Sequence, residues 1–273
     1  MIHKIKQLLE KILPQSLLEF TKTIYRYMQY LKNVKTNKNF KGQSVYCPCC
    51  KKSFVNFVNF NFNPLVYKAS NFVSSYQNTV CPNCNSLPRH RIISQYFENN
   101  KEKIISYSPS ILAIASDTSV RWLKNNNCKY TTADLFKTNA DLKMDIQDTK
   151  QPDKNWGLII CNHILEHIKD YKIALKELYR ILKDDGILEI TVPTDNNVDF
   201  TEESNEELTD AERLERFGQI DHLRTFGKDI YQILVNSGFN VEVINGENFP
   251  NIKGVVGPSK LCDNKVYICR KIK

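Results

Sequence analysis

The sequence predicts an α/β protein: a mostly parallel, seven-stranded sheet flanked by helices, preceded by a small cysteine-bearing module and an N-terminal helical arm. Three observations support this prediction. From residue 111 onward, short apolar runs alternate with helical or polar stretches, which is typical of a parallel sheet. Two Cys-x-x-Cys pairs precede that region, and a lysine-rich segment with helical apolar spacing precedes the cysteines.

Length, hydropathy and charge limit the possible domain organisation and cellular location. The 273 residues can bury the core of one α/β domain and an accessory module. No apolar run approaches the roughly 18 residues of a membrane span, and the N-terminus lacks the apolar core of a signal peptide. We therefore expect a cytoplasmic protein without a transmembrane segment. Charge is segregated: residues 1–40 hold eight Lys/Arg against two Glu, whereas residues 194–224 hold ten Asp/Glu against three Arg.

Residues 1–45 are predicted to form a basic arm and linker. Apolar side chains in residues 2–31 recur at helical steps with lysines on the other faces, and Pro14 divides the segment into two short amphipathic helices. These helices in residues 1–31 can pack on the body of the protein or on a second subunit. The alternative is contact with anionic lipid, which would make the protein peripheral to the inner face of a membrane.

Residues 46–100 carry the strongest metal signal in the sequence. Two Cys-x-x-Cys pairs about thirty residues apart can supply the four tetrahedral sulfurs of a structural zinc site: Cys47, Cys50, Cys81 and Cys84. Aromatic residues alternate with Asn and Ser between the pairs, which predicts hairpin strands and hence a zinc ribbon followed by a helix. Cys49 is expected to be a spectator. Reduced, unligated cysteines are the alternative interpretation. A closed site of four thiolates leaves no position for a substrate, so Zn²⁺ would be structural.

The stretch from Trp156 to Pro193 predicts a βαβ unit. Its first apolar run suits a strand buried on both faces, and Asp170 can then cap a helix whose apolar residues recur at three- and four-residue steps. Gly186 is expected to end that helix before the next strand. Ligands of open α/β sheets bind beyond the carboxyl ends of the strands, so Asn162 and His163 are expected at the mouth of a crevice.

Other strands are expected at residues 111–115, 129–132, 142–145, 187–192, 241–244 and 265–270. Asp134 follows the second of them, where a carboxylate can accept both hydroxyls of a nucleotide ribose. The acidic insert, residues 194–224, has the length of a lid or substrate-recognition element over the crevice.

Six segments together resemble the class I S-adenosylmethionine-dependent methyltransferases, Rossmann-like proteins, in the branch similar to methyltransferase type 11. They read ILAIAS at 111–116, YTTAD at 130–134, LKMDI at 142–146, IICNHILEHI at 159–168, LYRILKDDGILEITVP at 178–193 and FGQIDHLRTFG at 217–227. The likeness covers about residues 107–271, within a predicted domain at 107–273. The zinc-ribbon front end is similar to that found before some members.

The resemblance implies S-adenosyl-L-methionine as the cofactor. Asp134 would bind the ribose, Asp145 and Ile146 would flank the adenine, and Asn162 would lie beside the methionine and the reacting methyl group. The family's first strand usually ends in a glycine-rich turn, because glycine lets the backbone approach the cofactor closely.

In this sequence that turn has no glycine and reads Ala115-Ser-Asp-Thr-Ser119. The small side chains of Ala115 and Ser116 are expected to approach the cofactor instead. A turn without glycine also leaves open that cofactor binding has weakened or been lost.

The leading functional hypothesis is methyl transfer to a small-molecule or glycan acceptor, with O-methylation favoured. An alcohol acceptor needs a general base, and His163 and His222 are the candidates because imidazole titrates near neutrality. A structural histidine at the strand end and a surface histidine are the respective alternatives.

The sequence also offers three alternative functions. A zinc ribbon and a basic arm also accompany RNA methyltransferases, but the acidic insert opposes a polyphosphate at the same mouth. A methyltransferase fold without its cofactor turn could serve as a non-enzymatic binding module. The residues His163, Glu166 and His167 spell H-x-x-E-H, a zinc protease motif when on a helix; their place at the exit of a buried strand favours pocket lining.

Overall fold

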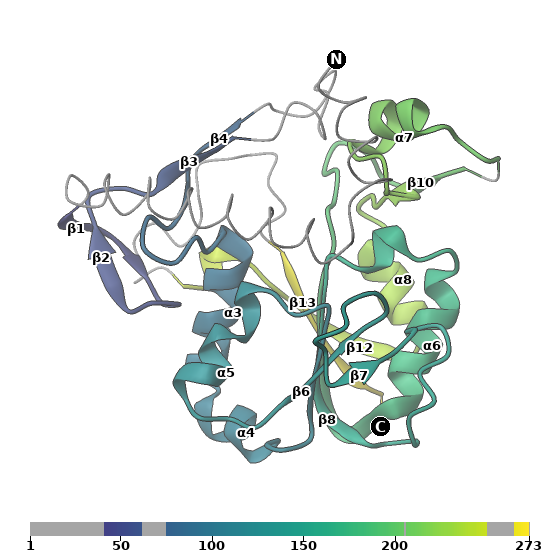
Figure 1. Ribbon diagram of the computed structural model, residues 1–273, viewed down its shortest axis with the longest axis horizontal. Coiled ribbons are helices and arrows are strands. Elements are labelled where there is room, and N and C mark those ends of the chain that lie inside the picture. Colours follow the sequence, from purple (N-terminus) through teal and green to yellow (C-terminus); the bar gives the residue numbers. More distant parts are fainter. Residues whose placement is uncertain (1–40, 62–74, 205, 250–264, 273) are drawn as a thin grey trace.

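The computed structural model describes residues 41–61, 75–204, 206–249 and 265–272 (Figure 1). The amphipathic helices expected in residues 1–31 lie outside the described residues. Strand β1 (Lys41–Cys47) begins inside the segment expected to be a linker. In the described part of the chain, no helix is long and apolar enough to cross a membrane.

Within the described residues, the main sheet has seven strands in the order β12-β13-β9-β8-β5-β6-β7. The strands are β5 (Ile111–Ile114), β6 (Thr131–Asp134), β7 (Leu142–Lys143), β8 (Trp156–Asn162), β9 (Leu182–Thr191), β12 (Phe239–Ile244) and β13 (Val266–Lys271). Strands β5 to β9 pair in parallel, whereas β13 pairs antiparallel with both β9 and β12. The predicted mostly parallel, seven-stranded sheet is confirmed, and β12 and β13 form an antiparallel pair at one edge.

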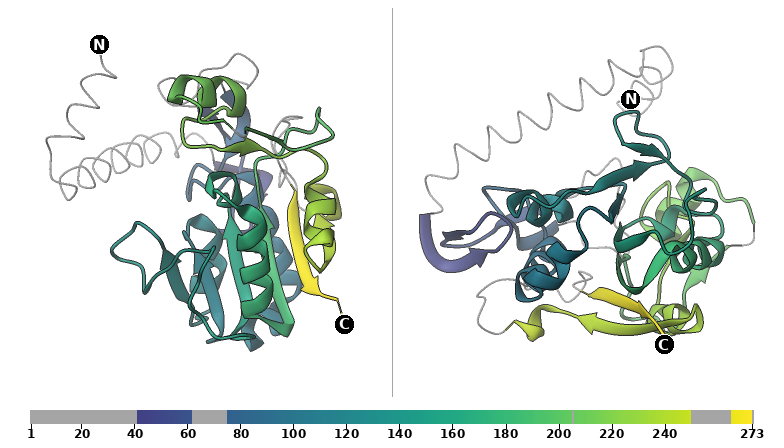
Figure 2. Two further views of the ribbon diagram at one scale, coloured as in Figure 1. Left: turned by 90° about the vertical axis from the view of Figure 1, so that its right-hand side faces the viewer. Right: turned by 90° about the horizontal axis from the view of Figure 1, so that it is seen from below.

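Helices cover both faces of this sheet (Figure 1, Figure 2). On one face lie α3 (Pro88–Asn99), α4 (Lys101–Ser106) and α5 (Arg121–Asn125), and on the other lie α6 (Tyr171–Ile181) and α8 (Ile230–Asn236). Alternate residues of β5 enter two different apolar clusters, one against each helical layer. Since both faces are buried, the central strands carry continuous apolar runs rather than alternation.

The helix of the βαβ unit begins as predicted and ends earlier. The Asp170 carboxylate accepts hydrogen bonds from the N–H groups of Lys172 and Ile173 at the start of α6. The prediction that Gly186 ends this helix was wrong, because the chain turns extended at Leu182 and pairs with β8. Gly186 serves close packing instead: a Cβ there would lie 2.8 Å from the Leu182 side chain.

The cysteine-bearing module consists of two antiparallel strand pairs, as predicted. Strand β1 pairs with β2 (Lys52–Phe54), and β3 (Val58–Asn61) pairs with β4 (Ser75–Val80). Helix α3 then leads from this module to the main sheet (Figure 1).

The acidic insert, residues 194–224, contains α7 (Asp210–Phe217) and two short paired strands, β10 (Glu202–Glu203) and β11 (Arg224–Thr225). It lies beyond the end of β9, and α7 and β10 are seen at the upper right of Figure 1. Thr209 and Glu212 form a capping box at the start of α7. The carboxyl edge of the parallel strands is therefore the edge that carries the acidic insert.

Candidate active site and cysteine cluster

The carboxyl ends of β5, β6 and β8 bring the predicted cofactor residues to one edge of the sheet. Strand β5 lies between β6 and β8, and the three strands are parallel. Ala115 follows β5, Asp134 is the last residue of β6, and Asn162 is the last residue of β8. The connection after β5 leads to one side of the sheet and the connection after β8 to the other. A reversal of this kind is where open α/β sheets place their ligand crevice.

Ala115 has a left-handed backbone, with φ +45°. Its N–H donates to the carbonyl oxygen of Ala133 at 2.8 Å, which fixes the turn against β6. Non-glycine residues adopt this conformation uncommonly, and the exceptions cluster at ligand sites. The turn thus keeps a conformation that favours glycine although the sequence has none there.

The same turn is tied to helix α3 by a partly buried hydrogen bond. His90 accepts the Leu87 N–H at Nδ1, so its proton lies on Nε2, which donates to the Asp117 carboxylate at 2.8 Å. Burial lowers the pKa of His90 to about 4, so the imidazole is neutral at pH 7. Asp117 also accepts the Ser119 N–H. The sequence contains no signal for this contact, which joins residues 27 apart.

Asp134 is buried at the end of β6, where its carboxylate accepts hydrogen bonds from the following turn. Its Oδ1 accepts the N–H groups of Phe136 and Lys137, both at 2.9 Å, and the Lys137 ammonium lies 3.2 Å from Oδ2. Burial raises the pKa of Asp134, but these donors outweigh it and lower the pKa below its ordinary value. The carboxylate is therefore ionised, as a ribose acceptor requires.

The next loop places two further predicted residues. The Asp145 carboxylate accepts the Gln147 N–H at 2.8 Å and so shapes its own turn. Ile146 is buried, with 3% of its surface exposed. Both lie directly after β7, next to β6 in the sheet.

His163 follows β8 with a left-handed backbone, φ +52°, and its Nδ1 lies 3.3 Å from the Glu166 carboxylate. Glu166 and His167 lie on a short 3₁₀ turn, Leu165–His167, rather than on a helix. His222 is 4% exposed, so the interpretation as a surface histidine is wrong. The structure brings His222 against His167, with ring centroids 4.8 Å apart. The sequence predicted His163 and His222 as candidates, but it did not predict the contact between His222 and His167.

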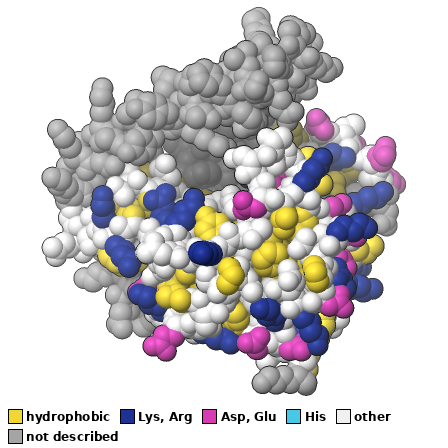
Figure 3. All heavy atoms as spheres, turned by 60° about the horizontal axis from the view of Figure 1, so that its bottom comes forward, with side chains coloured by type: hydrophobic (Ala, Val, Ile, Leu, Met, Phe, Trp, Pro, Cys, Tyr) yellow, Lys and Arg dark blue, Asp and Glu magenta, His cyan; other side chains and the backbone are white. Residues whose placement is uncertain are grey.

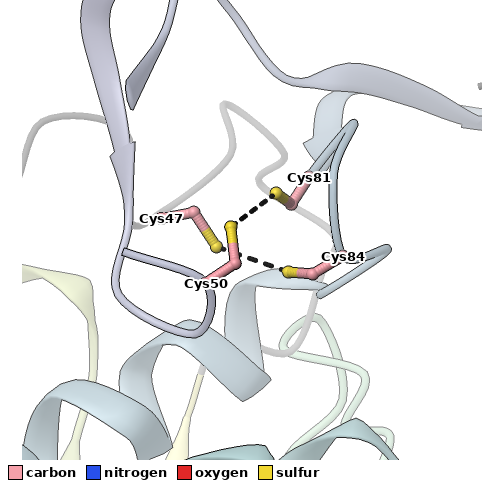
Figure 4. A group of neighbouring side chains, drawn as sticks. All are labelled: Cys47, Cys50, Cys81 and Cys84. Atoms are coloured by element: carbon pink, nitrogen blue, oxygen red, sulfur yellow. Dashed lines mark hydrogen bonds between the residues drawn. The ribbon is translucent and has the colours of Figure 1, made fainter. Parts of the chain in front are cut away.

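The four predicted zinc ligands converge in one cluster (Figure 4). Sγ of Cys47 lies 3.6 Å from Sγ of Cys84, and Sγ of Cys50 lies 3.7 Å from Sγ of Cys81. Tetrahedral zinc with bonds of about 2.3 Å requires sulfurs about 3.8 Å apart, so the spacing fits. Cys49 points elsewhere, to the His90 carbonyl and the Ser94 hydroxyl, which fits a spectator.

A buried arginine supports the same assignment. The Arg91 guanidinium stacks on the Phe57 ring at 4.0 Å and donates to the Ser86 carbonyl. It also lies close enough to the cysteine cluster to interact with the thiolates. Four thiolates around Zn²⁺ carry a net charge of −2, and a neighbouring buried cation offsets that charge.

A groove of about 750 Å³ lies at the opposite edge of the sheet and is lined in part by Lys103, Asp185 and Arg270. It contains none of the predicted site residues. The candidate site is therefore assigned from the strand ends and not from this groove.

The seven-stranded sheet and the family match together define a class I S-adenosylmethionine-dependent methyltransferase. A family profile described as a methyltransferase domain matches residues 106–243. The chain belongs to this methyltransferase-domain family. No sequence among curated proteins matches it.

Several solved methyltransferase structures are similar to part of the chain. An S-adenosylmethionine-dependent methyltransferase from Archaeoglobus fulgidus has 13% identity over 65% of this chain and 94% of its own, with a TM-score of 0.42. The 1,6-didemethyltoxoflavin-N1-methyltransferase of Burkholderia thailandensis has 12% identity over 68% and 79%, with a TM-score of 0.42. Phosphoethanolamine N-methyltransferase 2 of Haemonchus contortus has 16% identity over 65% and 53%, with a TM-score of 0.38. Such low identity transfers neither an acceptor nor a site residue to this chain.

Proposed function

We propose that the protein methylates a hydroxyl group of a small-molecule or glycan acceptor. The observation that carries this proposal is the pair formed by His163 and the buried carboxylate of Glu166 at the end of β8. A carboxylate beside Nδ1 holds an imidazole in the tautomer whose Nε2 accepts a proton. An alcohol loses its proton on methylation, whereas a tertiary amine or thiolate acceptor needs no such base.

Cofactor binding is assigned to the residues at the sheet edge. S-adenosyl-L-methionine supplies a methyl group on a sulfonium sulfur, ready for in-line displacement. Asp134 accepts the ribose hydroxyls, Asp145 and Ile146 border the adenine, and the turn at Ala115 and Ser116 lets the backbone approach the methionine portion. Asn162 orders the end of β8 beside the methyl group. The protein mainly aligns donor and acceptor, and His163 accepts the acceptor's proton.

The acceptor class follows from charge. The acidic insert follows β9 at the proposed mouth, where it repels a polyphosphate chain. Figure 3 turns the lower end of the molecule forward, away from the proposed mouth, and there basic side chains lie among apolar and acidic ones. A neutral small molecule or glycan fits this charge distribution better than RNA does.

The cysteine cluster is proposed to hold one structural Zn²⁺ through Cys47, Cys50, Cys81 and Cys84. Four sulfurs fill the tetrahedral positions, so this ion would take no part in methyl transfer. Any role of residues 1–31 in membrane or subunit contact stays a prediction.

Two measurements test the proposed reaction. Calorimetric titration with S-adenosylhomocysteine should give binding that Asp134→Asn weakens at least tenfold, while Asp148→Asn, an exposed carboxylate in the next loop, keeps wild-type affinity. No heat at millimolar concentration would favour the non-enzymatic binding module. Labelled cofactor with glycan, lipid and RNA fractions then identifies the acceptor, and His163→Gln should lower turnover by about 10²–10⁴. Label entering RNA alone would contradict the proposed acceptor.

A further inference from the structure

The carboxylate of Glu166 is fully buried, and its contact with His163 offsets the negative charge only in part. The side chain is 0% exposed, and Nδ1 of His163 lies 3.3 Å from Oε1. Neither oxygen accepts a hydrogen bond of good geometry from the described residues, and His167 Nε2 lies 4.0 Å from Oε1. A buried charge is costly unless it is paired or coordinates a metal ion, so this carboxylate calls for a cationic partner.

Two imidazoles next to Glu166 are held in the tautomer that metal ligands adopt. His167 Nδ1 lies 3.1 Å from the Asp221 carbonyl oxygen, and His222 Nδ1 lies 3.1 Å from the Phe217 carbonyl oxygen. A carbonyl only accepts hydrogen bonds, so each Nδ1 carries the proton and each Nε2 keeps its lone pair. Metal-bound histidines are oriented in the same way by a backbone carbonyl or carboxylate.

From this geometry we infer that Glu166, His167 and His222 form a binding site for a divalent transition-metal ion. One ligand atom from each residue lies within 4.8 Å of the other two. Metal–ligand bonds of about 2.1 Å require the ligand atoms to lie roughly 3–3.5 Å apart. Side-chain movements of about 1 Å bring the three ligand atoms to this separation. The H-x-x-E-H spacing thus gives only part of the ligand set, and His222 completes it from the acidic insert.

The backbone that carries these ligands is fixed in advance by Arg224, which is 3% exposed. Its guanidinium donates to the carbonyl oxygens of Leu165, Ile168 and Lys169. The Leu223 N–H donates to the Glu166 carbonyl at 2.9 Å. These bonds join the 3₁₀ turn to the end of the acidic insert, so the ligand set does not depend on a lid closing.

The donor set indicates the kind of ion. Two neutral imidazoles and one carboxylate suit Zn²⁺, Mn²⁺ or Fe²⁺ better than Ca²⁺ or Mg²⁺, which prefer oxygen ligands. Three protein ligands leave coordination positions open. The His163 and His167 side chains are 29% and 33% exposed, so the cluster can be reached from solvent. An acceptor oxygen can occupy an open position on the ion, and this step rests on the proposed function. Binding of the ion itself does not depend on that function.

Manganese chloride is the probe that separates this site from the cysteine cluster, because Mn²⁺ prefers nitrogen and oxygen ligands to thiolates. Free Mn²⁺ is measured by electron paramagnetic resonance during titration of the full chain, without cofactor or acceptor. Wild type should bind one ion per chain. Glu166→Gln and His222→Ala should each weaken binding at least tenfold, whereas Glu215→Gln, an exposed carboxylate on α7, should not.

Thermal unfolding controls for misfolded variants. Without metal, Glu166→Gln should be about as stable as wild type, because it removes a buried charge that the neutral His163 offsets only in part. Mn²⁺ should raise the unfolding temperature of wild type and not of Glu166→Gln. Equal affinity in both proteins, or no binding by wild type, would overturn the inference. An inactive enzyme that binds Mn²⁺ would refute only the proposed methyl transfer.

Discussion

Asn162 Nδ2 donates a hydrogen bond to the Glu189 carboxyl group at 2.9 Å, inside the domain at the end of β8. The Asn162 carbonyl oxygen accepts the Thr191 hydroxyl at 2.6 Å, so both ends of the amide are engaged. Glu189 is 0% exposed on strand β9, which pairs with β8 and β13 inside the sheet. Burial raises the pKa of Glu189 to about 8. The side chain of Asn162 thus orders the strand ends at the candidate site by holding a largely protonated acid.

Replacing Glu189 with Gln should remove a pH dependence of stability. The neutral acid stabilises the fold fully below its ordinary pKa of 4.5, and this contribution is lost as pH rises through about 8. Glu189→Gln should therefore match wild type near pH 4.5 and exceed its unfolding free energy by up to a few kcal/mol at pH 8.5. Urea unfolding at both pH values measures this difference. Glu102→Gln, exposed on α4, is the control; parallel pH profiles of wild type and Glu189→Gln would contradict the argument.

The left-handed backbone of Ala115 predicts an order of cofactor affinity. Glycine adopts φ +45° without steric cost, alanine at a cost of about 1 kcal/mol, and β-branched residues at a higher cost. Affinity for S-adenosylhomocysteine should therefore rank Ala115→Gly equal to or above wild type, and both well above Ala115→Val. Calorimetric titration measures the series. Wild-type affinity in Ala115→Val would show that the turn does not contact the cofactor.

Local sequence signals predicted most of the sheet and the site residues taken singly. Continuous apolar runs identified strands buried on both faces, and Asp170 identified the start of α6 because a cap depends on neighbouring residues alone. The helix end predicted at Gly186 was wrong because Leu182 pairs with β8 and ends the helix earlier. Pairing between strands depends on distant residues, so neighbouring residues do not reveal it.

Contacts between distant segments could not be predicted in the same way. His222 meets Glu166 and His167 because Arg224 binds carbonyls of the 3₁₀ turn, and no periodicity encodes a side chain reaching distant backbone. The cysteine cluster is the exception, since the Cys-x-x-Cys spacing itself reflects the geometry of one ion.

Arg224→Lys should loosen the acidic insert. Lysine has one ammonium group and cannot reproduce the planar set of donors that contacts three carbonyl oxygens, some of which would stay buried without partners. The expected loss of unfolding free energy is about 2–4 kcal/mol, with faster hydrogen exchange in residues 217–225. Arg216→Lys, whose guanidinium makes an exposed ion pair with Glu202, is the matched control. Unchanged exchange in Arg224→Lys would show that the insert is held by other contacts.

The cysteine cluster predicts a sharp difference between two buried thiols of the same module, those of Cys81 and Cys49. Cys81 belongs to the four-sulfur set, whereas Cys49 hydrogen-bonds to the His90 carbonyl and the Ser94 hydroxyl outside it. Cys81→Ser should therefore release zinc, because a serine hydroxyl is a poor ligand for this ion, while Cys49→Ser should retain one zinc per chain. Metal analysis of the purified proteins by mass spectrometry gives the counts.

Loss of that zinc should unfold strands β1 to β4 selectively, since structural zinc supplies much of the folding free energy of so small a module. The domain from residue 107 has its own apolar core and should keep its thermal transition. Hydrogen exchange on Cys81→Ser separates the two regions: rapid exchange in β1 to β4 with protection kept in β5, β8 and β9 is the expected pattern. Full zinc occupancy in Cys81→Ser would show that Cys81 is not a ligand, and loss of zinc in Cys49→Ser would show that Cys49 is one. Either result would refute the assignment of ligands.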